Sequence, residues 1–548
     1  MGEWCTQKAV RAERLAAGRP YAEDKRVSPK NLRNLLEAVL RPGDRVCLEG
    51  DNQKQADVLA AALAEVDPKK VHDLHMVQSG VVLPEHLDLF DRGIARRLDY
   101  SYSGPQAARI ARMLFGGQIE LGAVHTYLEL FARYFIDLTP QVALIAAVSA
   151  DRQGNLYTGP NTEDTPTVVE ATSYKDGLVI AQVANIVDQV PRVDIPGDLV
   201  HFVVEAKKPF YVEPLFTRDP AAITETQILT AMLAIKGIYA PYGVRRLNHG
   251  IGFSTAAVEL LLPTFAERLG LKGAVCTHFA LNPHPTLIPA IEAGWVQQVH
   301  CFGSEVGMED YVAARPDVFF TGPDGSLRSN RAFCQTAGLY ACDMFIGSTL
   351  QIDVEGHSST VTTSRIAGFG GAPNMGSDAR GRRHVSEPWL KAGAEADPKG
   401  SPALRRGRKL VVQIGETFGE GNNPQFVERL DALDLAEKLK LELAPVMVYG
   451  DDVTHIVTEE GIANLLLCRD RDEREQAIRG VAGYTEVGRA RDRKMVERLR
   501  ERGVIRRPAD LGIDPLDADR SLLAARSIKD LMRASNGLYR PPSRFRNW

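Results

Sequence analysis

Residues 366–384, IAGFGGAPNMGSDARGRRH, bring several glycines and a proline together directly before a group of arginines. Glycine adopts positive φ easily and lets a ligand approach the main chain closely. Successive N–H groups in such a turn can form a concave site for an anion. The stretch therefore favours main-chain binding of an anion or an oxyanion. A tight turn without a binding role has a similar composition, so the rest of the chain has to decide between the two.

Composition and charge exclude several classes of protein. The chain has 548 residues, of which 44% are hydrophobic and 25% charged, as in ordinary globular proteins. Its net charge of −4 provides no overall basic field for nucleic acid. The polar start lacks the apolar core of a signal peptide, and no apolar run approaches the roughly 20 residues that cross a bilayer. The seven cysteines show no paired or zinc-type spacing. We expect a cytoplasmic protein without a structural metal, a nucleic-acid partner or a membrane anchor.

The elements that must position the glycine stretch follow an α/β pattern, because short apolar runs alternate with longer amphipathic segments. Residues 44–64 predict a strand, a glycine turn and a helix, and residues 245–261 predict the same unit again. Residues 141–155 and 343–357 are each an apolar strand that ends in a D-x-x-G turn. The two motifs stand at nearly the same offset in both halves, which indicates two copies of one domain.

The predicted organisation has four parts. We expect an N-terminal extension (1–28), a first domain (29–222), a second domain (223–470) and a helical, charged C-terminal region (471–548). Each domain should contain a mainly parallel sheet flanked by helices. Ligand sites favour the crevice between such halves, so the site is expected there.

Five motifs, taken in order, resemble the acyl-CoA transferase family. They are VSADRQGNLYTG (148–159), VIAQVANIVDQVP (179–191), HGIGFSTAA (249–257), GFGGAPNM (368–375) and HIVTEEGIANL (455–465). The resemblance implies two tandem CoA-transferase-like domains.

Within that family, PNMGSDARGRRH and the end of the chain, RSLLAARSIKDLMRASNGLYRPPSRFRNW, are similar to the α subunits of malonate decarboxylase. The similarity runs from about residue 30 to the last residue. It implies a transferase that exchanges acetyl for malonyl on the thiol of an acyl carrier protein and releases acetate. The implied partners are that carrier protein, the decarboxylase subunits of the same complex, malonate and acetate. The resemblance further implies that no cofactor is bound directly, since the carrier protein of this family carries a CoA-like phosphoribosyl-dephospho-CoA group.

The resemblance also implies roles for individual residues. The N–H groups of Gly370, Gly371 and Ala372 could stabilise the oxyanion that forms when a carboxylate attacks a thioester. The residues expected to contact the prosthetic group are Gly368, Asn374, Gly250, Gly252, Asn155, Asn185, Arg382 and Arg383. For the two asparagines, hydrogen bonds to the local backbone are an equal alternative. Arg380, Arg382 and Arg383 could pair with phosphates or with an acidic carrier face, or form a solvated loop.

His278 is the most informative departure from the family. Many transferases of this fold use a glutamate nucleophile, and here VCTHFALNP (275–283) has His278 at the matching position. The implied reaction then passes through a mixed anhydride, with no covalent enzyme thioester. His278 could bind malonate or polarise a carbonyl, or be a histidine satisfied in the core. Glu305, in FGSEVG (302–307), is the rival carboxylate in a glycine turn.

Two other functions remain open at this level. One is a related enzyme, either a citrate lyase α subunit or a free CoA transferase for short acids. The other is a ligand sensor or scaffold that keeps the fold without catalysis, because fold alone does not determine function.

Overall fold

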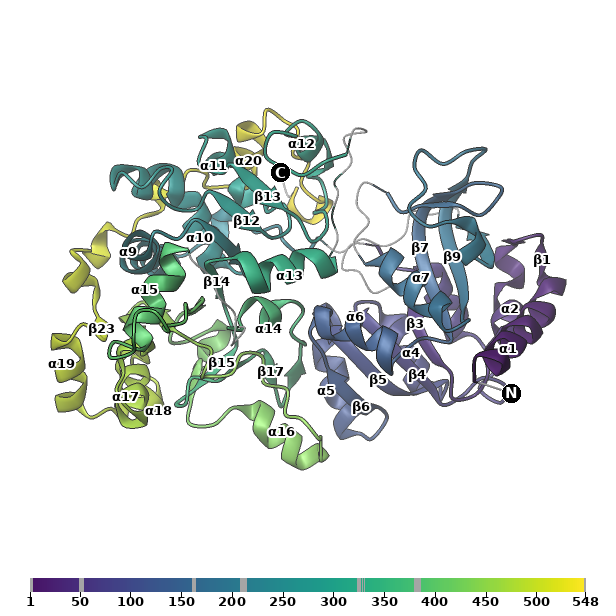
Figure 1. Cartoon of the computed structure of the whole chain (residues 1–548), viewed down its shortest axis with the longest axis horizontal. Coiled ribbons are helices and arrows are strands. Elements are labelled where there is room, and N and C mark those ends of the chain that lie inside the picture. Colours follow the sequence, from purple (N-terminus) through teal and green to yellow (C-terminus); the bar gives the residue numbers. More distant parts are fainter. Residues whose placement is uncertain are drawn as a thin grey trace.

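The computed structural model is shown in Figure 1, and it describes residues 3–48, 54–159, 164–206, 214–322, 327, 329, 331–378 and 386–546. Two large sheets, each flanked by helices, lie in the two halves of the molecule. This arrangement confirms the predicted α/β class. No helix within these ranges is long and apolar enough to cross a membrane.

The first sheet has the order β1-β2-β10-β9-β7-β3-β4-β5-β6, with β8 paired to β7. Its strands are β1 (Ala22–Glu23), β2 (Arg26–Val27), β3 (Arg45–Leu48), β4 (Leu74–Gly80), β5 (Ala95–Tyr102), β6 (Glu120–Val124), β7 (Val142–Ala150), β8 (Leu156–Tyr157), β9 (Leu178–Ile186) and β10 (Phe202–Glu205). All neighbours run parallel except β1 with β2 and β7 with β8. Strand β7 is buried almost throughout, as expected for a parallel strand that is covered on both faces.

The helices of the first half cover this sheet. They are α1 (Glu3–Gly18), α2 (Leu32–Val39), α3 (Asp57–Ala64), α4 (Pro84–Asp91), α5 (Ala107–Phe115), α6 (Tyr127–Ile136) and α7 (Thr165–Tyr174). In α5 the buried residues are Ala107, Ile110, Ala111, Met113 and Leu114, the spacing of one apolar helix face.

The second sheet has the order β13-β12-β11-β14-β19-β21-β22-β23. Its strands are β11 (Arg246–His249), β12 (His278–Ala280), β13 (Gln298–His300), β14 (Met344–Gly347), β19 (Leu410–Ile414), β21 (His455–Thr458), β22 (Gly461–Asn464) and β23 (Ile505–Arg506). The first six strands of this order run parallel, and β22 and β23 add an antiparallel edge. The C-terminal region, expected to be helical, therefore also contributes a strand to this sheet.

Two smaller sheets and the remaining helices complete the second half. The small sheets contain β15 (Gln351–Asp353), β16 (Ser358–Ser359) and β20 (Phe426–Val427), and β17 (Val361–Thr362) with β18 (Arg365–Ile366). The helices are α8 (Glu225–Ala234), α9 (Ala240–Tyr242), α10 (Phe253–Leu261), α11 (Ile288–Glu292), α12 (Glu309–Ala313), α13 (Arg331–Ala341), α14 (Ala372–Met375), α15 (Glu387–Ala396), α16 (Asp431–Leu439), α17 (Arg471–Val481), α18 (Glu486–Arg489), α19 (Arg493–Glu501) and α20 (Ile528–Ala534).

The D-x-x-G turns repeat in atomic detail. One carboxylate oxygen of Asp151 accepts hydrogen bonds of 3.0 and 2.9 Å from the N–H groups two and four residues later. Asp353 accepts the same two bonds at the same distances. The glycines of the turns, Gly154 and Gly356, have φ of 85° and 86°, a conformation that favours glycine. The equivalence supports an internal repeat, while the exact domain boundaries stay a prediction.

The halves are joined by a segment of the second half that packs on the first. The hairpin of β17 and β18, together with α16, lies beside α5 (Figure 1). Val361, Ile366 and Leu430 belong to the same buried apolar cluster as Leu98 and Ile110 of the first half. The loop that follows β18 is the glycine stretch, so this packing brings it to the junction of the halves.

Candidate active site

A cavity of about 320 Å³ lies between the two halves. Tyr102 and Tyr127 of the first half form one wall, and the loops after β11, β12 and β14 form the opposite wall. These loops follow the carboxyl ends of parallel strands, where ligands bind in open α/β sheets. The expected crevice is therefore present, and the glycine stretch lies along it: Gly368, Phe369, Gly370, Gly371 and Ala372 all line the cavity.

The glycine loop is fixed to the end of β5. The carbonyl oxygen of Ser101 accepts hydrogen bonds from the N–H groups of Phe369 and Gly370, at 2.8 and 2.9 Å. Gly368 forms an antiparallel bridge with Tyr102. The φ angles of Gly368 and Gly370 are 74° and 58°, so both positions favour glycine. The first half thus determines the shape of a loop that belongs to the second.

This docking corrects one of the three expected oxyanion donors. The N–H of Gly370 donates to Ser101 and is not free for a ligand. The N–H of Ala372 makes only a long bond of 3.3 Å, to Phe369 O. No hydrogen-bond partner of the Gly371 N–H is found in the part of the chain that the structure describes. Gly371 and Ala372 are therefore the donors that remain.

Asn374 and the glycines of the 249–257 turn hold the site together. Asn374 accepts a 2.7 Å hydrogen bond from Thr126 Oγ1 and donates to Gln335 Oε1 at 3.2 Å, so it ties α14 to α6 and α13. Gly250 lines the cavity, whereas Gly252 does not. A β-carbon on Gly250 would lie 2.8 Å from the Cα of Gly347, so this glycine lets two loops cross closely.

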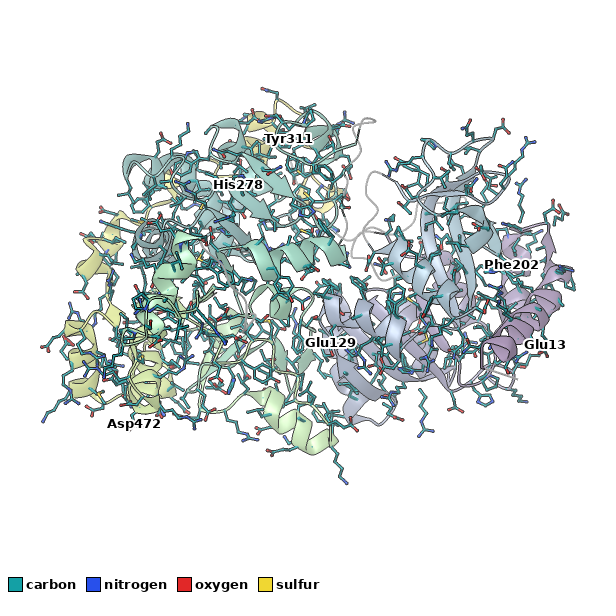
Figure 2. The ribbon with its side chains drawn as sticks, in the orientation of Figure 1. Glu13, Glu129, Phe202, His278, Tyr311 and Asp472 are labelled. Atoms are coloured by element: carbon teal, nitrogen blue, oxygen red, sulfur yellow. The ribbon has the colours of Figure 1, made fainter. Side chains whose placement is uncertain are left out.

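His278 lies at the wrong end of its strand for catalysis. It is the first residue of β12, pairs in register with Arg246 and does not line the cavity; Figure 2 labels it within the second half. Burial and the charge of Arg246 lower its pKa. The carboxyl end of the same strand leads to Leu281 and His284, which do line the cavity. The expectation that His278 takes part in the chemistry is therefore not supported by its position.

Glu305 is fully buried behind the cavity wall. Its Oε2 accepts a 3.1 Å hydrogen bond from the N–H of Phe216, and its Oε1 accepts bonds of 3.0 and 2.7 Å from the N–H and Oγ1 of Thr217. Burial raises the pKa of this carboxyl. With both oxygens bonded, Glu305 fixes the 216–217 backbone and is not placed to act as a nucleophile.

The remaining expected residues lie elsewhere. The side chain of Asn155 donates to Asp151 and accepts from the N–H of Gly197, so it stabilises the turn in which it lies. Asn185 is exposed at the end of β9, away from the cavity. Arg380, Arg382 and Arg383 are outside the described residues.

Glu259, His249 and His284 form a buried triad that was not predicted from the sequence. His249 and His284 line the cavity, and Glu259 supports both of them. The Nδ1 atoms of both histidines lie 2.9 Å from Glu259 Oε1. Although burial acts to raise it, the charges and hydrogen bonds of His284 and His249 lower the pKa of Glu259 to about 2. His284 stacks on Phe216 at 5.5 Å between ring centroids. The only signal in the sequence that could have pointed to His284 is its position between two prolines in LNPHP (281–285).

Two buried or partly buried arginines in the cavity wall were also missed, as was a third, Arg365, which is exposed. Arg331 lies over the Tyr127 ring, 4.5 Å from its centroid, and is 3.3 Å from Asp164. Arg218 is partly buried and lies 5.9 Å from the centroid of the Phe253 ring. No group of three or more His, Cys, Asp or Glu among the described residues is placed to hold a metal ion.

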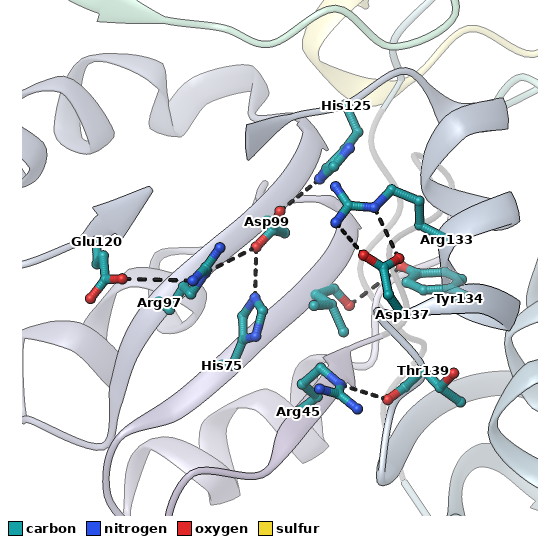
Figure 3. A network of polar contacts seen from close by, with 11 residues as sticks. Arg45, His75, Arg97, Asp99, Glu120, His125, Arg133, Tyr134, Asp137 and Thr139 are labelled. Carbon is teal, nitrogen blue, oxygen red and sulfur yellow. Dashed lines mark hydrogen bonds and ion pairs between the residues drawn. The ribbon is translucent and has the colours of Figure 1, made fainter. Parts of the chain in front are cut away.

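A charged network supports the first-half wall from behind (Figure 3). Asp99 of β5 lies 2.6 Å from His75 Nε2 and 2.7 Å from His125 Nε2. Burial acts to raise the pKa of Asp99, but the two histidines hold it well below its usual range. His125 directly precedes Thr126 and Tyr127, and the N–H of Tyr127 donates to Gly370 O at 3.1 Å. The network therefore positions the residues on which the glycine loop rests.

Comparison with known proteins agrees with this architecture. A family model described as malonate decarboxylase, alpha subunit, transporter matches residues 3–548. The chain is 63% identical over 539 residues, 98% of this chain and 97% of the relative, to an acetyl-S-ACP:malonate ACP transferase of Malonomonas rubra.

Solved structures give the same result. A chain of a Pseudomonas malonate decarboxylase hetero-tetramer, solved in complex with malonate, is 58% identical and has a TM-score of 0.96, with 100% of both chains covered. An acyl-CoA transferase of Escherichia coli O157:H7 is 14% identical, with a TM-score of 0.50 and coverage of 79% of this chain and 87% of that chain. The latter match concerns the fold alone, and it confirms the expected CoA-transferase-like architecture.

Proposed function

The chain belongs to the family of malonate decarboxylase α subunits, and on this premise we propose that it is an acetyl-S-ACP:malonate ACP transferase. It exchanges acetyl for malonyl on the thiol of a carrier protein and releases acetate. The decarboxylation that regenerates acetyl belongs to other subunits of the complex. The hetero-tetrameric assembly of the Pseudomonas relative supports the existence of such partners.

The composition of the cavity wall indicates how the acyl group is transferred. No aspartate, glutamate, cysteine or lysine is present among the described residues that line it. An enzyme thioester with the carrier thiol would need a carboxylate side chain, and an acetylated enzyme would most readily form on a cysteine, or on a serine or threonine with an adjacent base. Ser348 and Thr360 do line the cavity, but neither forms a hydrogen bond to His249 or His284. This lining favours a direct reaction of the two substrates with each other.

The exchange then has two steps. A carboxylate oxygen of malonate attacks the acetyl thioester carbon, and collapse of the tetrahedral oxyanion breaks the C–S bond to give a mixed anhydride and the carrier thiolate. The thiolate attacks the malonyl carbonyl of the anhydride, and acetate leaves. Each oxyanion needs preorganised donors, and loss of one such donor typically lowers the rate by about 10²–10³. The N–H groups of Gly371 and Ala372 are suited to this role.

His284 can stabilise the same charges. Its Nδ1 is directed to Glu259, so only Nε2 remains for a ligand in the cavity. An N–H at Nε2 donates to an oxyanion or to the departing thiolate, and the contact of Nδ1 with Glu259 fixes the ring in that orientation. His249 is different, because its Nε2 lies 3.1 Å from the hydroxyl of Tyr239; both of its nitrogens are engaged.

The carrier protein supplies the thiol on its CoA-like arm. Phe302, Phe345, Met375 and Met447 give the cavity an apolar side that suits the pantetheine part of such an arm. A role of Arg382 and Arg383 in binding its phosphates or the carrier surface stays a prediction.

The test is incubation of the purified chain with acetylated carrier protein and labelled malonate. We expect label on the carrier thiol and stoichiometric acetate, without CO₂. Efficient CO₂ release by this chain alone would contradict the assignment. A preference for citrate would favour the citrate lyase alternative, turnover of free CoA esters would favour a free CoA transferase, and the lack of any transfer would favour a ligand sensor or scaffold.

A further inference from the structure

Arg218 presents an unmatched positive charge to the cavity. Its Nη1 donates to the carbonyl oxygens of Leu215 and Thr217, both at 2.9 Å. No aspartate or glutamate among the described residues forms an ion pair with it. Burial lowers the pKa of Arg218, and the charge of Glu305 acts in the opposite direction. A partly buried guanidinium without a carboxylate partner is costly, unless a ligand supplies the anion.

The other two arginines of the wall do not combine partial burial with the lack of a carboxylate partner. Arg331 already faces Asp164 at 3.3 Å. Arg365 is exposed to solvent at the rim, where water screens its charge. Arg218 is therefore the guanidinium whose environment most needs an anion.

The segment that carries Arg218 is rigidly held. Glu305 binds the backbone of Phe216 and Thr217, as described above. The hydroxyl of Tyr539, in the C-terminal tail, lies 3.4 Å from Thr217 Oγ1, and Arg544 donates to Pro214 O at 2.6 Å. These contacts fix the backbone of residues 214–218, and they therefore fix the position of the Arg218 guanidinium at the cavity.

We propose that Arg218 binds the carboxylate of malonate that does not react, and thereby selects malonate over monocarboxylates. The inference rests on the proposed function, which brings malonate into this cavity. Malonate and acetate offer the same attacking group, and they differ in that malonate carries a second carboxylate. Arg218 donates to that second carboxylate in free malonate, in the anhydride and in the malonyl thioester.

This arrangement discriminates between the two acids as acceptors of acetyl. A site built to hydrogen-bond a polar substrate group rejects the analogue that lacks it by up to about 10⁴–10⁵-fold, since its own group is left unpaired. Acetate leaves Arg218 without an anion, so acetate is a poor acceptor of acetyl from the acetylated carrier protein. Glu305 is then a positioning residue, which acts on the substrate through the Phe216–Arg218 backbone.

The experiment compares Arg218→Met and Arg218→Lys with Arg365→Met, a matched change of another arginine of the same wall. Acetylated carrier protein is incubated with labelled malonate or with labelled acetate, and kcat/KM is measured for each. We expect the malonate-to-acetate ratio to fall by about 100-fold or more in Arg218→Met, and by less in Arg218→Lys, where a point charge remains. Arg365→Met should keep the wild-type ratio.

A second readout does not depend on turnover. Malonate should raise the melting temperature of the wild-type chain and of Arg365→Met, and it should have little effect on Arg218→Met. If Arg218→Met does not melt cooperatively, Arg218→Lys is used for both measurements, with at least a 10-fold higher KM for malonate expected. An unchanged ratio, or a parallel loss of both exchanges with an intact malonate-induced shift, would overturn the proposal. If the wild-type chain moves no label but malonate still raises its melting temperature through Arg218, the proposed function fails, whereas the assignment of Arg218 as a carboxylate-binding residue stands.

Discussion

The Cα of Gly371 lies against the side-chain amide of Gln335: a β-carbon at residue 371 would be 2.2 Å from Gln335 Nε2. Gln335 is fully buried on α13 and accepts a hydrogen bond from Asn374. The loop therefore lacks a side chain at its free N–H donor because a helix of the second half occupies that space.

Gly371→Val should lower turnover by about 10²-fold, because the displaced loop moves its donors by about 1 Å. Overpacking should cost about 1–3 kcal/mol of stability, so the folded domain persists. Turnover and melting temperature of the same variant test this. Near-normal turnover would mean that the loop is only a turn.

Gln335→Ala combined with Gly371→Ala is the matched control. Removing the amide opens the space that the new β-carbon needs, so the double variant should recover much of the stability lost in Gly371→Ala. The coupling is measured by a double-mutant cycle. Additive effects would show that the clash lies elsewhere.

Gly368→Ala should be more damaging than Gly371→Ala. Its β-carbon would lie 2.4 Å from the carbonyl oxygen of Ser101, which is backbone and cannot turn away. The positive φ of 74° adds strain of roughly 1–2 kcal/mol. We expect a lower melting temperature and loss of transfer, since the loop would leave the end of β5. A variant as stable as Gly371→Ala would contradict this order.

The sequence was sufficient for the fold and for the position of the glycine loop. Apolar strand patterns and the paired D-x-x-G turns are local features, and Asp151 and Asp353 indeed form the same turn. The loop was recognisable because its glycines serve backbone contacts, which depend on residue type alone.

Residues whose role depends on long-range placement could not be recognised. His278 matched a family position, but the cavity lies at the other end of β12, and strand length decides which end a residue occupies. Glu305 is suitable by type, yet its oxygens are taken by a segment almost ninety positions away. Glu259 and His284 are 25 residues apart, and no periodicity links a helix residue to a loop after the next strand.

Glu259→Gln should lower turnover and change the response to acid. The folded pKa of Glu259, about 2, lies below its unfolded value of about 4.3. Its contribution to stability is therefore present above pH 4.3 and is lost as the pH falls toward 2. Acid-unfolding curves should be flatter in this range for Glu259→Gln.

His284→Gln separates chemistry from stability. It removes the ring nitrogen that remains for the ligand, so we expect a loss of about 10²–10³-fold in kcat, with a smaller fall in melting temperature than His249→Gln gives, since both rings contact Glu259 but His249 also contacts Tyr239. The ring of His249 contacts Tyr239 and Phe279 in the core. His249→Gln should therefore lower stability more than His284→Gln does. Equal effects of the two changes on kcat would argue against a specific role of His284.

Stability at alkaline pH should depend on His125. Burial acts to lower the pKa of this histidine, but the hydrogen bond to Asp99 and the ion pair with Glu129 prevail and raise it. A raised folded pKa means that the contribution to stability is complete below the unfolded value of about 6.5 and is lost as the pH rises through the folded value. Asp99 also faces His75 and Arg97, so part of the network stays charged when His125 loses its proton.

The wild-type melting temperature should therefore fall as the pH rises above about 6.5, and His125→Gln should flatten that fall. His201→Gln is the control of opposite sign, because burial lowers the pKa of His201 to about 4 and so confines its effect to the acid side. Because His125 leads directly into Tyr127, which holds Gly370 O, turnover should decline over the same alkaline range. An alkaline decline that is equally steep in His125→Gln would show that another group causes it.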